Sequence, residues 1–302
     1  MIDGSPAVTV VIPTYNHAHF LKNALQSVIN QTFMNWEAIV INNFSEDNTI
    51  EVVNGFADPR IRLINYHNHG IIASSRNEGI RAAKADLIAF LDSDDLWHPL
   101  KLERCLEKLT PNIDLVCHGL RFIKDGVFWR EMKYGPEKKA RFDSLLYRGN
   151  ALTPSAVLLR KQCLLKVGGF TEDINYVTAE DYDLWLKLAK EKIHFHFIDD
   201  ILGDYQLHNE NASKAVLRQM KASLEVVNYH FNTNTITFWR HIKIRYRRGL
   251  ILYGAARGFQ KSGQYIEALQ YLGKSFIMFP FIIRLYAALI INVFLIIKTK
   301  FH

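Results

Sequence analysis

The chain has 302 residues, of which 49% are hydrophobic and 22% charged, a composition typical of a globular protein that excludes a disordered or fibrous chain. Its net charge of +7 is uneven, because residues 235–302 hold eleven Lys or Arg and one acid. We therefore expect this part to have an anionic partner, such as a membrane surface or nucleic acid. Three cysteines without paired spacing exclude a disulfide framework and favour a reduced, cytoplasmic setting.

The first hundred residues alternate between strand and helix patterns. Short apolar runs cover residues 7–13, 36–42, 60–66 and 86–92, and amphipathic patterns such as HFLKNALQSVINQ lie between them. Apolar strands separated by helices predict βαβ units and a parallel sheet covered on both faces. Ligands of such sheets bind beyond the carboxyl ends of the strands. We therefore expect three polar clusters to converge there: PTYNH (13–17), NNFSED (42–47) and DSDD (92–95).

After residue 110 the pattern changes to α+β. A hairpin turning at Asp125-Gly126, a strand over 155–160, a short helix closed by glycines and a helix near Glu180 can form the second wall of a cleft. From about residue 214 the chain is helical and basic. We expect a donor-binding half over 1–110, an acceptor-binding and catalytic half over 111–213 of the same domain, and a helical C-terminal extension over 214–302.

Three carboxylates, Asp92, Asp94 and Asp95, directly follow the fourth strand pattern. Like charges this close repel each other by about 1 kcal/mol per pair in water, so a cation is expected beside them. Mg²⁺ and Mn²⁺ take oxygen ligands, usually one or two carboxylates together with substrate phosphates. The alternative is a solvated loop of helix-capping acids, although three acids exceed what a cap requires.

Four segments, VVIPTYN, NNFSEDNT, SSRNEGIRAAKADLIAFLDSDD and AEDYDLW, occur in an order and spacing that resemble the bacterial family 2 glycosyltransferases over roughly residues 8–210. The resemblance implies a GT-A fold, which is a Rossmann-like mixed sheet flanked by helices. It also implies an inverting transfer from a nucleotide sugar, expected to be a UDP-sugar, with Mn²⁺ or Mg²⁺ as the cofactor.

The resemblance also assigns residues to the donor and the metal. Asp94, Asp95 and His208 match metal ligands, although Gln206 stands where an arginine is usual near that histidine. Asn43 stands where the family has an aspartate that bonds the base or ribose, so the identity of the base is open. The donor-binding residues that it implies are Pro13, Thr14, Tyr15, Asn43, Ser45, Arg76, Asn77, Asp92, Ser93 and Asp94.

An inverting transfer needs one base that takes the proton of the acceptor hydroxyl. The resemblance gives this role to Asp181 in AEDYDLW, with Glu180 and Trp185 beside the acceptor or behind the base. Taken without the acidic cluster at residues 92–95, Asp181 is better explained as an acid at a helix N-terminus, where the macrodipole favours it. A non-catalytic sugar-nucleotide scaffold or sensor at the membrane is the alternative function, motivated by the departures at residues 42, 43 and 206.

The C-terminal extension has two interpretations. Residues 252–280 resemble one tetratricopeptide unit, and the apolar run over 281–297 is interrupted by Arg284 and preceded by Pro280. Flanking lysines and arginines favour a helix lying on an anionic membrane surface. The alternative is a helix packed on the domain or in a homodimer. No nucleic-acid-binding motif is recognisable, so we expect a peripheral protein on the inner face of the plasma membrane, acting on a glycan or lipid-linked glycan acceptor.

Overall fold

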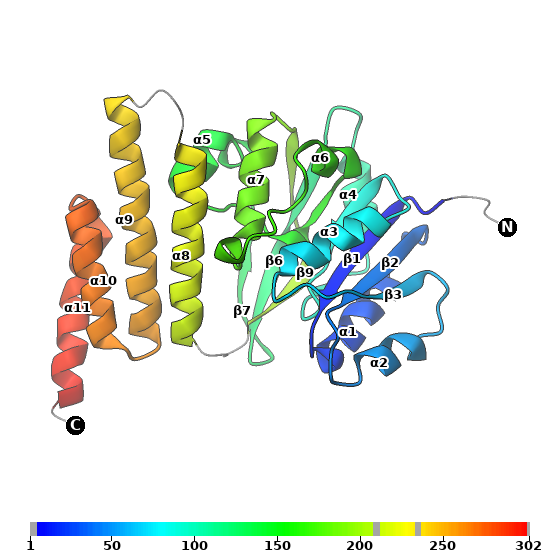
Figure 1. Ribbon diagram of the computed structural model, residues 1–302, viewed down its shortest axis with the longest axis horizontal. Coiled ribbons are helices and arrows are strands. Elements are labelled where there is room, and N and C mark those ends of the chain that lie inside the picture. The colour runs from blue at the N-terminus through cyan, green and yellow to red at the C-terminus, as the bar shows by residue number, and fades with distance from the viewer. Residues whose placement is uncertain (1–4, 208–211, 233–236, 301–302) are drawn as a thin grey trace. The chain divides into compact units, whose positions relative to one another are not determined.

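The computed structural model describes residues 5–207, 212–232 and 237–300, and the chain divides into two compact units. The first, which we call the sheet unit, comprises residues 1–142, 151–174 and 183–208. The second, the helical unit, comprises residues 143–150, 175–182 and 209–302. Figure 1 shows the strands within the sheet unit and the long C-terminal helices within the helical unit.

The described strands of the sheet unit form one nine-stranded sheet with the order β3-β2-β1-β4-β8-β6-β9-β5, and β7 pairs with β6 (Figure 1). The strands are β1 (Val8–Thr14), β2 (Trp36–Asn42), β3 (Ile61–Asn65), β4 (Leu87–Phe90), β5 (Leu96–Trp97), β6 (Leu115–Lys124), β7 (Val127–Met132), β8 (Val157–Arg160) and β9 (Phe195–Leu207). The first four run parallel, whereas β8 runs antiparallel to both β4 and β6. The predicted α/β fold with a mixed sheet is confirmed, and its parallel part is the half built from βαβ units.

The helices α1 and α3 cover opposite faces of this parallel part. The helices outside the C-terminal extension are α1 (Ala18–Ile29), α2 (Thr49–Gly55), α3 (Ile72–Ala82), α4 (Lys101–Lys108), α5 (Phe142–Arg148), α6 (Lys161–Lys166) and α7 (Glu180–Lys190). Successive side chains of a strand point to opposite faces, so Val10 joins the apolar cluster under α1 while Val11 faces α3. At Gly79 of α3 a Cβ atom would lie 2.3 Å from Val11 Cγ1, so only glycine allows α3 to pack this closely.

The hairpin predicted at residues 125 and 126 is also confirmed. Strands β6 and β7 pair antiparallel across this turn, and both Asp125 and Gly126 have positive φ, at 51° and 76°. Two positive φ values suit a two-residue hairpin turn, which explains why an Asp-Gly pair occupies it.

The helical unit contains α8 (Ala212–Phe231), α9 (Phe238–Lys261), α10 (Tyr265–Met278) and α11 (Ile283–Lys300), as the predicted helical extension requires. A small apolar core holds the last three helices together: Ala256, Leu272, Ile282, Leu285 and Ala288. Gln260 adds polar bonds from α9 to α11, donating to the Ala288 carbonyl at 2.9 Å and to Asn292 Oδ1 at 3.0 Å. None of the helices described is both long and apolar enough to span a membrane.

Candidate active site

A pocket of about 390 Å³ opens at the carboxyl ends of β1, β2 and β4, where parallel sheets place their ligands. All three polar clusters predicted to converge contribute to it, although not with every residue. The lining residues are Pro13, Thr14, Tyr15, His17, Asn43, Asn68, Gly70, Ile72, Asp92, Ser93, Asp94 and Tyr205. Of the ten predicted donor-binding residues, seven are therefore on its wall.

One end of the pocket is acidic and polar. Asp92, Ser93 and Asp94 leave the end of β4 and line this end. The buried guanidinium of Arg76 in α3 donates from Nη2 to Asp92 Oδ1 at 2.7 Å, which balances the charge of that carboxylate. On the other side, His17 Nδ1 lies 3.0 Å from Ser93 Oγ. The acidic loop is therefore held from both sides by contacts from α3 and from the start of α1.

Asp95, which is predicted to be a metal ligand, belongs to the same acidic cluster but is not among the residues that line the pocket. Its side chain is 1% exposed, and its oxygens accept from Ser155 Oγ at 2.6 Å and from the Gln206 N–H at 3.1 Å. Burial and the nearby charges of Asp94 and Asp92 raise the pKa of this carboxyl well above its usual range. Asp95 therefore joins the acidic loop to the end of β9.

The other end of the pocket is made of neutral polar groups. Asn43 follows β2 and lines the pocket, and its Oδ1 accepts from the Asn68 N–H at 3.0 Å. The Thr14 side chain at the end of β1 is buried, and Oγ1 has no hydrogen-bond partner among the described residues. Tyr15 is 51% exposed at the rim. Ser45, in contrast, lies outside the lining and donates to Asn42 Oδ1 at 2.7 Å.

Two predicted donor-binding residues of α3, Arg76 and Asn77, pack behind the pocket instead of lining it. Arg76 is 3% exposed and donates to Asp92, which lines the pocket. Asn77 donates to the Phe170 carbonyl at 2.9 Å and accepts from the Phe170 N–H at 2.9 Å. Its Nδ2 also donates to Glu172 at 2.7 Å. These contacts tie α3 to the loop after residue 168.

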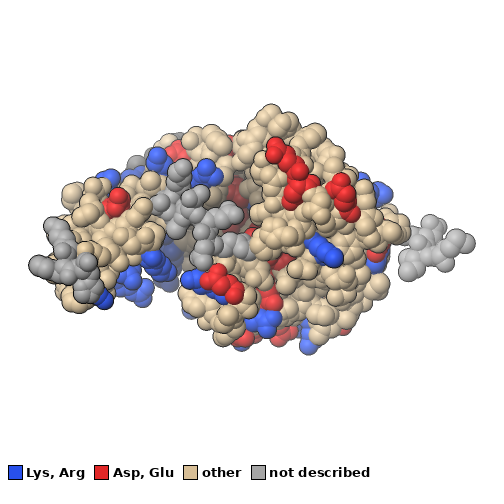
Figure 2. All heavy atoms as spheres, turned by 90° about the horizontal axis from the view of Figure 1, so that it is seen from below, with Lys and Arg blue, Asp and Glu red and all other residues tan. Residues whose placement is uncertain are grey.

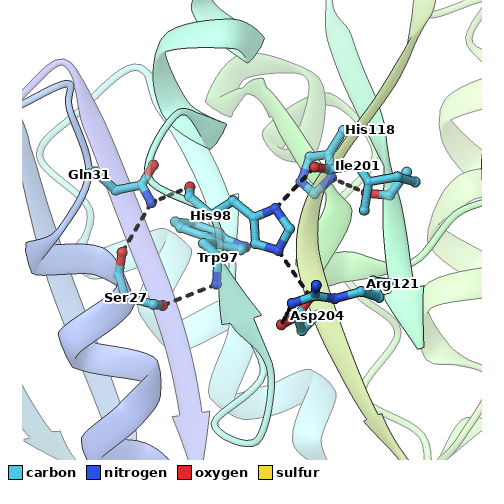
Figure 3. Close-up of polar contacts among 9 residues, drawn as sticks. Ser27, Gln31, Trp97, His98, His118, Arg121, Ile201 and Asp204 are labelled. Atoms are coloured by element: carbon cyan, nitrogen blue, oxygen red, sulfur yellow. Dashed lines mark hydrogen bonds and ion pairs between the residues drawn. The ribbon is translucent and has the colours of Figure 1, made fainter. Parts of the chain in front are cut away.

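A polar network holds the end of β9 beside the pocket (Figure 3). Asp204 lies 3.0 Å from His98 Nε2 and accepts from Arg121 Nε and Nη2 at 2.8 and 2.7 Å. Burial by itself would raise the pKa of Asp204, but these hydrogen bonds and charges lower it below its usual value. The next residue, Tyr205, lines the pocket and contacts the Phe122 ring, with centroids 4.9 Å apart.

The predicted base belongs to the helical unit. Asp181 Oδ2 accepts from Asn150 Nδ2 at 2.9 Å, and Oδ1 accepts from the Tyr182 N–H at 2.7 Å. Glu180 is buried and caps the preceding turn by accepting from the Thr178 N–H at 2.8 Å. Trp185 is fully buried, which makes it a core residue of α7. The predicted metal ligand His208 lies outside the described residues.

The pocket suits a divalent cation that arrives with a ligand. Asp92 and Asp94 supply oxygen donors at its acidic end. Within residues 5–207, 212–232 and 237–300, no group of three or more His, Cys, Asp or Glu is placed to hold a metal ion by itself. Mg²⁺ is commonly bound by one or two carboxylates plus substrate phosphates, not by a complete protein cage, so this donor set fits such an ion.

The chain is similar in sequence to known glycosyltransferases. The model of the family described as glycosyl transferase family 2 matches residues 9–168. Hyaluronan synthase of Pasteurella multocida is 31% identical over 252 residues, which cover 80% of this chain but only 24% of the synthase. UDP-Glc:alpha-D-GlcNAc-diphosphoundecaprenol beta-1,3-glucosyltransferase WfgD of Escherichia coli is 31% identical over 225 residues, 73% of this chain and 85% of WfgD.

Two solved structures share the fold. Residues 1–349 of S. aureus TarS, in complex with UDP, superpose with a TM-score of 0.62 at 16% identity, covering 94% of this chain and 88% of that one. The mannosyltransferase PcManGT from Pyrobaculum calidifontis, in complex with GDP-Man and Mn²⁺, gives a TM-score of 0.60 at 17% identity, covering 97% and 86%. At these identities the likeness concerns the fold.

Proposed function

Because this chain belongs to glycosyl transferase family 2, we propose that it transfers a sugar from a nucleotide-sugar donor to a hydroxyl group of a glycan or lipid-linked glycan. The observation that carries the proposal is the pocket at the carboxyl ends of β1, β2 and β4. Carboxylates line one end and neutral donors and acceptors line the other, which is the polarity that a nucleoside diphosphate with a cation requires. UDP, which TarS binds in its solved complex, is the first nucleotide to test.

Asp94 and Asp92 would hold a Mn²⁺ or Mg²⁺ ion that arrives with the diphosphate. Such an ion would stabilise the negative charge that develops on the leaving nucleotide. The chain's own contribution is to hold the two carboxylates in place. Arg76 balances the charge of Asp92, and Ser155 hydrogen-bonds both the Asp92 N–H and the Asp95 carboxylate.

Asp181 is the base that takes the proton of the acceptor hydroxyl as this oxygen attacks the anomeric carbon, which inverts its configuration. Support comes from its sequence context and from its bond to Asn150, which holds one oxygen in a defined orientation. A carboxylate with such a partner keeps its geometry while the second oxygen accepts a proton.

The helical unit carries the features of a protein that lies on an anionic membrane surface. Figure 2 shows Lys and Arg side chains gathered over this unit, where acidic side chains are sparse. The same unit also has exposed apolar side chains: Phe238, Trp239, Ile277, Phe281, Ile283, Ile290 and Phe294. Cations near a surface of anionic lipids contribute about 1 kcal/mol each, and apolar side chains enter the headgroup region. WfgD acts on a diphosphoundecaprenol acceptor, so a lipid-linked acceptor at the inner face of the membrane is consistent with this surface.

A transfer assay with a panel of nucleotide sugars, with and without Mn²⁺, tests the activity. We expect turnover that EDTA abolishes, and Asp181→Asn should lower turnover by about 10²-fold or more while donor binding stays unchanged. Asp86→Asn, at an exposed position of the sheet unit, is the matched control and should keep full activity. Nucleotide binding without turnover of any donor would instead identify a sensor or scaffold.

The membrane proposal has its own test. The full chain should sediment with vesicles that contain phosphatidylglycerol and stay in solution with phosphatidylcholine alone. The double variant Arg245→Glu/Arg284→Glu should lose most of this binding, because it reverses two charges on the helical unit. Equal sedimentation with both vesicle types, or preferential binding to an oligonucleotide, would contradict the assignment.

A further inference from the structure

We propose that Asn43 presents a hydrogen-bond donor to the nucleobase, so that the pocket takes a cytidine nucleotide at least as tightly as a uridine nucleotide. The inference rests on the proposed function, because it concerns the base of the nucleotide bound in the same pocket. It follows from the direction of the hydrogen bonds that the chain itself makes at the neutral end of the pocket.

The strand order determines which end receives the base. Asn43 follows β2, Thr14 ends β1, and Asp92 and Asp94 follow β4, while the strands lie in the order β2-β1-β4. The pocket therefore runs from amide and hydroxyl groups at one end to carboxylates at the other. The diphosphate needs the cation and hence the carboxylates, so the base lies at the end formed by Asn43 and Thr14.

Of the two consecutive asparagines at the end of β2, Asn43 is the one available to a ligand. Asn42 is fully buried, its Nδ2 donates to Asn65 Oδ1 at 2.8 Å, and its Oδ1 accepts from both the N–H and the hydroxyl of Ser45. An amide that already donates and accepts twice inside the protein has little left for a ligand. Asn42 therefore shapes the loop, and Asn43 faces the base.

The orientation of the Asn43 amide is set by its neighbour. The Asn68 N–H can only donate, so the atom 3.0 Å from it is the oxygen of Asn43. Asn68 is itself buried and held by Ser75 Oγ at 2.8 Å and by the Gly70 N–H at 2.9 Å, so its N–H stays in place. The Nδ2 group of Asn43, which has no acceptor among the described residues, is the group left for the base.

Thr14 shows that the ligand supplies a polar group at this end. Its side chain is 5% exposed, it lines the pocket, and its Oγ1 has no hydrogen-bond partner among residues that the structure describes. A buried hydroxyl without a partner is costly, and a base edge that hydrogen-bonds it removes this cost. Because a hydroxyl both donates and accepts, Thr14 accepts either pyrimidine, and the choice falls to Asn43.

Cytosine and uracil differ in the hydrogen-bonding atoms that an amide N–H can contact. Cytosine carries an acceptor at N3 and at O2, whereas uracil carries an N–H at N3 between two carbonyl oxygens. A carboxylate at position 43 would accept from the uracil N–H and repel cytosine N3. The amide N–H of Asn43 does the reverse, since it donates to cytosine N3 and meets the uracil N–H donor to donor.

Isothermal titration of the full chain with CDP and with UDP, both in Mn²⁺, tests the inference. We expect wild type to bind CDP at least as tightly as UDP. Asn43→Asp should shift the ratio of the two dissociation constants toward UDP by about tenfold or more. The control Asn48→Asp adds the same charge to an exposed position of the same loop, whose side chain makes no capping bond, and should leave the ratio unchanged.

The possible failures are distinguishable. If UDP binds clearly more tightly than CDP to the wild-type chain, the pocket still holds a nucleotide and the proposed function stands, but the role of Asn43 is refuted. If neither nucleotide binds with Mn²⁺ or Mg²⁺, the nucleotide site itself fails, and this inference fails with it. Thermal unfolding of Asn43→Asp tests whether the variant is folded. If it is not folded, the ratio of the CDP and UDP dissociation constants of the wild-type chain still tests the inference.

Discussion

The Lys101 side chain should destabilise the folded protein at neutral pH, so that Lys101→Met is more stable than wild type. Lys101 is 0% exposed and donates from Nζ to the Val157 carbonyl at 3.2 Å, with the ammonium 3.7 Å from the centroid of the Trp97 ring. Burial lowers the pKa of this ammonium from 10.5 to about 8. The difference corresponds to a cost of about 3 kcal/mol for the charged side chain below pH 8.

Methionine removes this cost and also the favourable contacts. The lost hydrogen bond to Val157 is worth about 1 kcal/mol, and the lost cation–π contact with Trp97 about 1 kcal/mol. Methionine fills a similar volume, so we expect a net gain of roughly 1 kcal/mol at pH 7. Lys108→Met at the exposed end of the same helix is the control and should change the free energy of unfolding by less than about 0.5 kcal/mol.

The dependence on pH separates this cause from simple repacking. Because the folded pKa is lower than the unfolded pKa, the unfolded chain binds more protons between pH 8 and 10.5. Wild-type stability therefore rises relative to Lys101→Met across this window, by about 3 kcal/mol in total, and the order of the two proteins reverses. Urea denaturation followed by tryptophan fluorescence at pH 7 and pH 10.5 measures the difference. A variant that is less stable at both pH values by the same amount would refute the reasoning.

Four other substitutions have definite expected results. Asp204→Asn should lose less stability below pH 5 than wild type does, in acid titrations monitored by circular dichroism. The pKa of Asp204 is lower in the folded chain than in the unfolded chain, so its carboxylate stabilises the fold above the unfolded pKa, and this stabilisation is lost as the pH falls. Gly79→Ala should lower the free energy of unfolding by about 1–3 kcal/mol through its clash with Val11, whereas Gly273→Ala, with open space around it in α10, should raise it by up to about 1 kcal/mol. Ser155→Ala leaves the Asp95 carboxylate without the donor Ser155 Oγ and the Asp92 N–H without its acceptor. The free energy of unfolding should therefore fall by about 1–3 kcal/mol, and the melting temperature and the nucleotide affinity should both decrease.

The sheet and its ligand edge could be predicted because the signals are local. Apolar runs separated by amphipathic helices indicate βαβ units and a parallel sheet, which β1 to β4 form, whereas their order in the sheet is known only from the structure. Asp92, Asp94, Thr14 and Asn43 could be assigned to the pocket for the same reason, since each lies at the end of a parallel strand or within four residues after it. Their roles in binding stay predictions.

The remaining site residues depend on contacts that are distant in sequence. Tyr205 reaches the pocket because β9 pairs with β6 and with β5, a pairing between segments about a hundred residues apart that no local pattern encodes. Arg76 and Asn77 match a donor-site motif, but their burial under the sheet depends on the close packing at Gly79. Asn68 and His17 carry only the composition of ordinary turns, which does not distinguish them from surface residues.

The bonds of Asp95 bear on how mutations of the acidic loop are to be interpreted. One carboxylate joins three separate parts of the chain: the loop after β4, the turn before β8 and the end of β9. Replacing it disturbs all three, so activity and melting temperature should fall together. Replacing Asp94, which lines the pocket, should lower activity by more than its effect on the melting temperature explains. Paired measurements of activity and melting temperature therefore distinguish a residue that builds the site from one that acts in it.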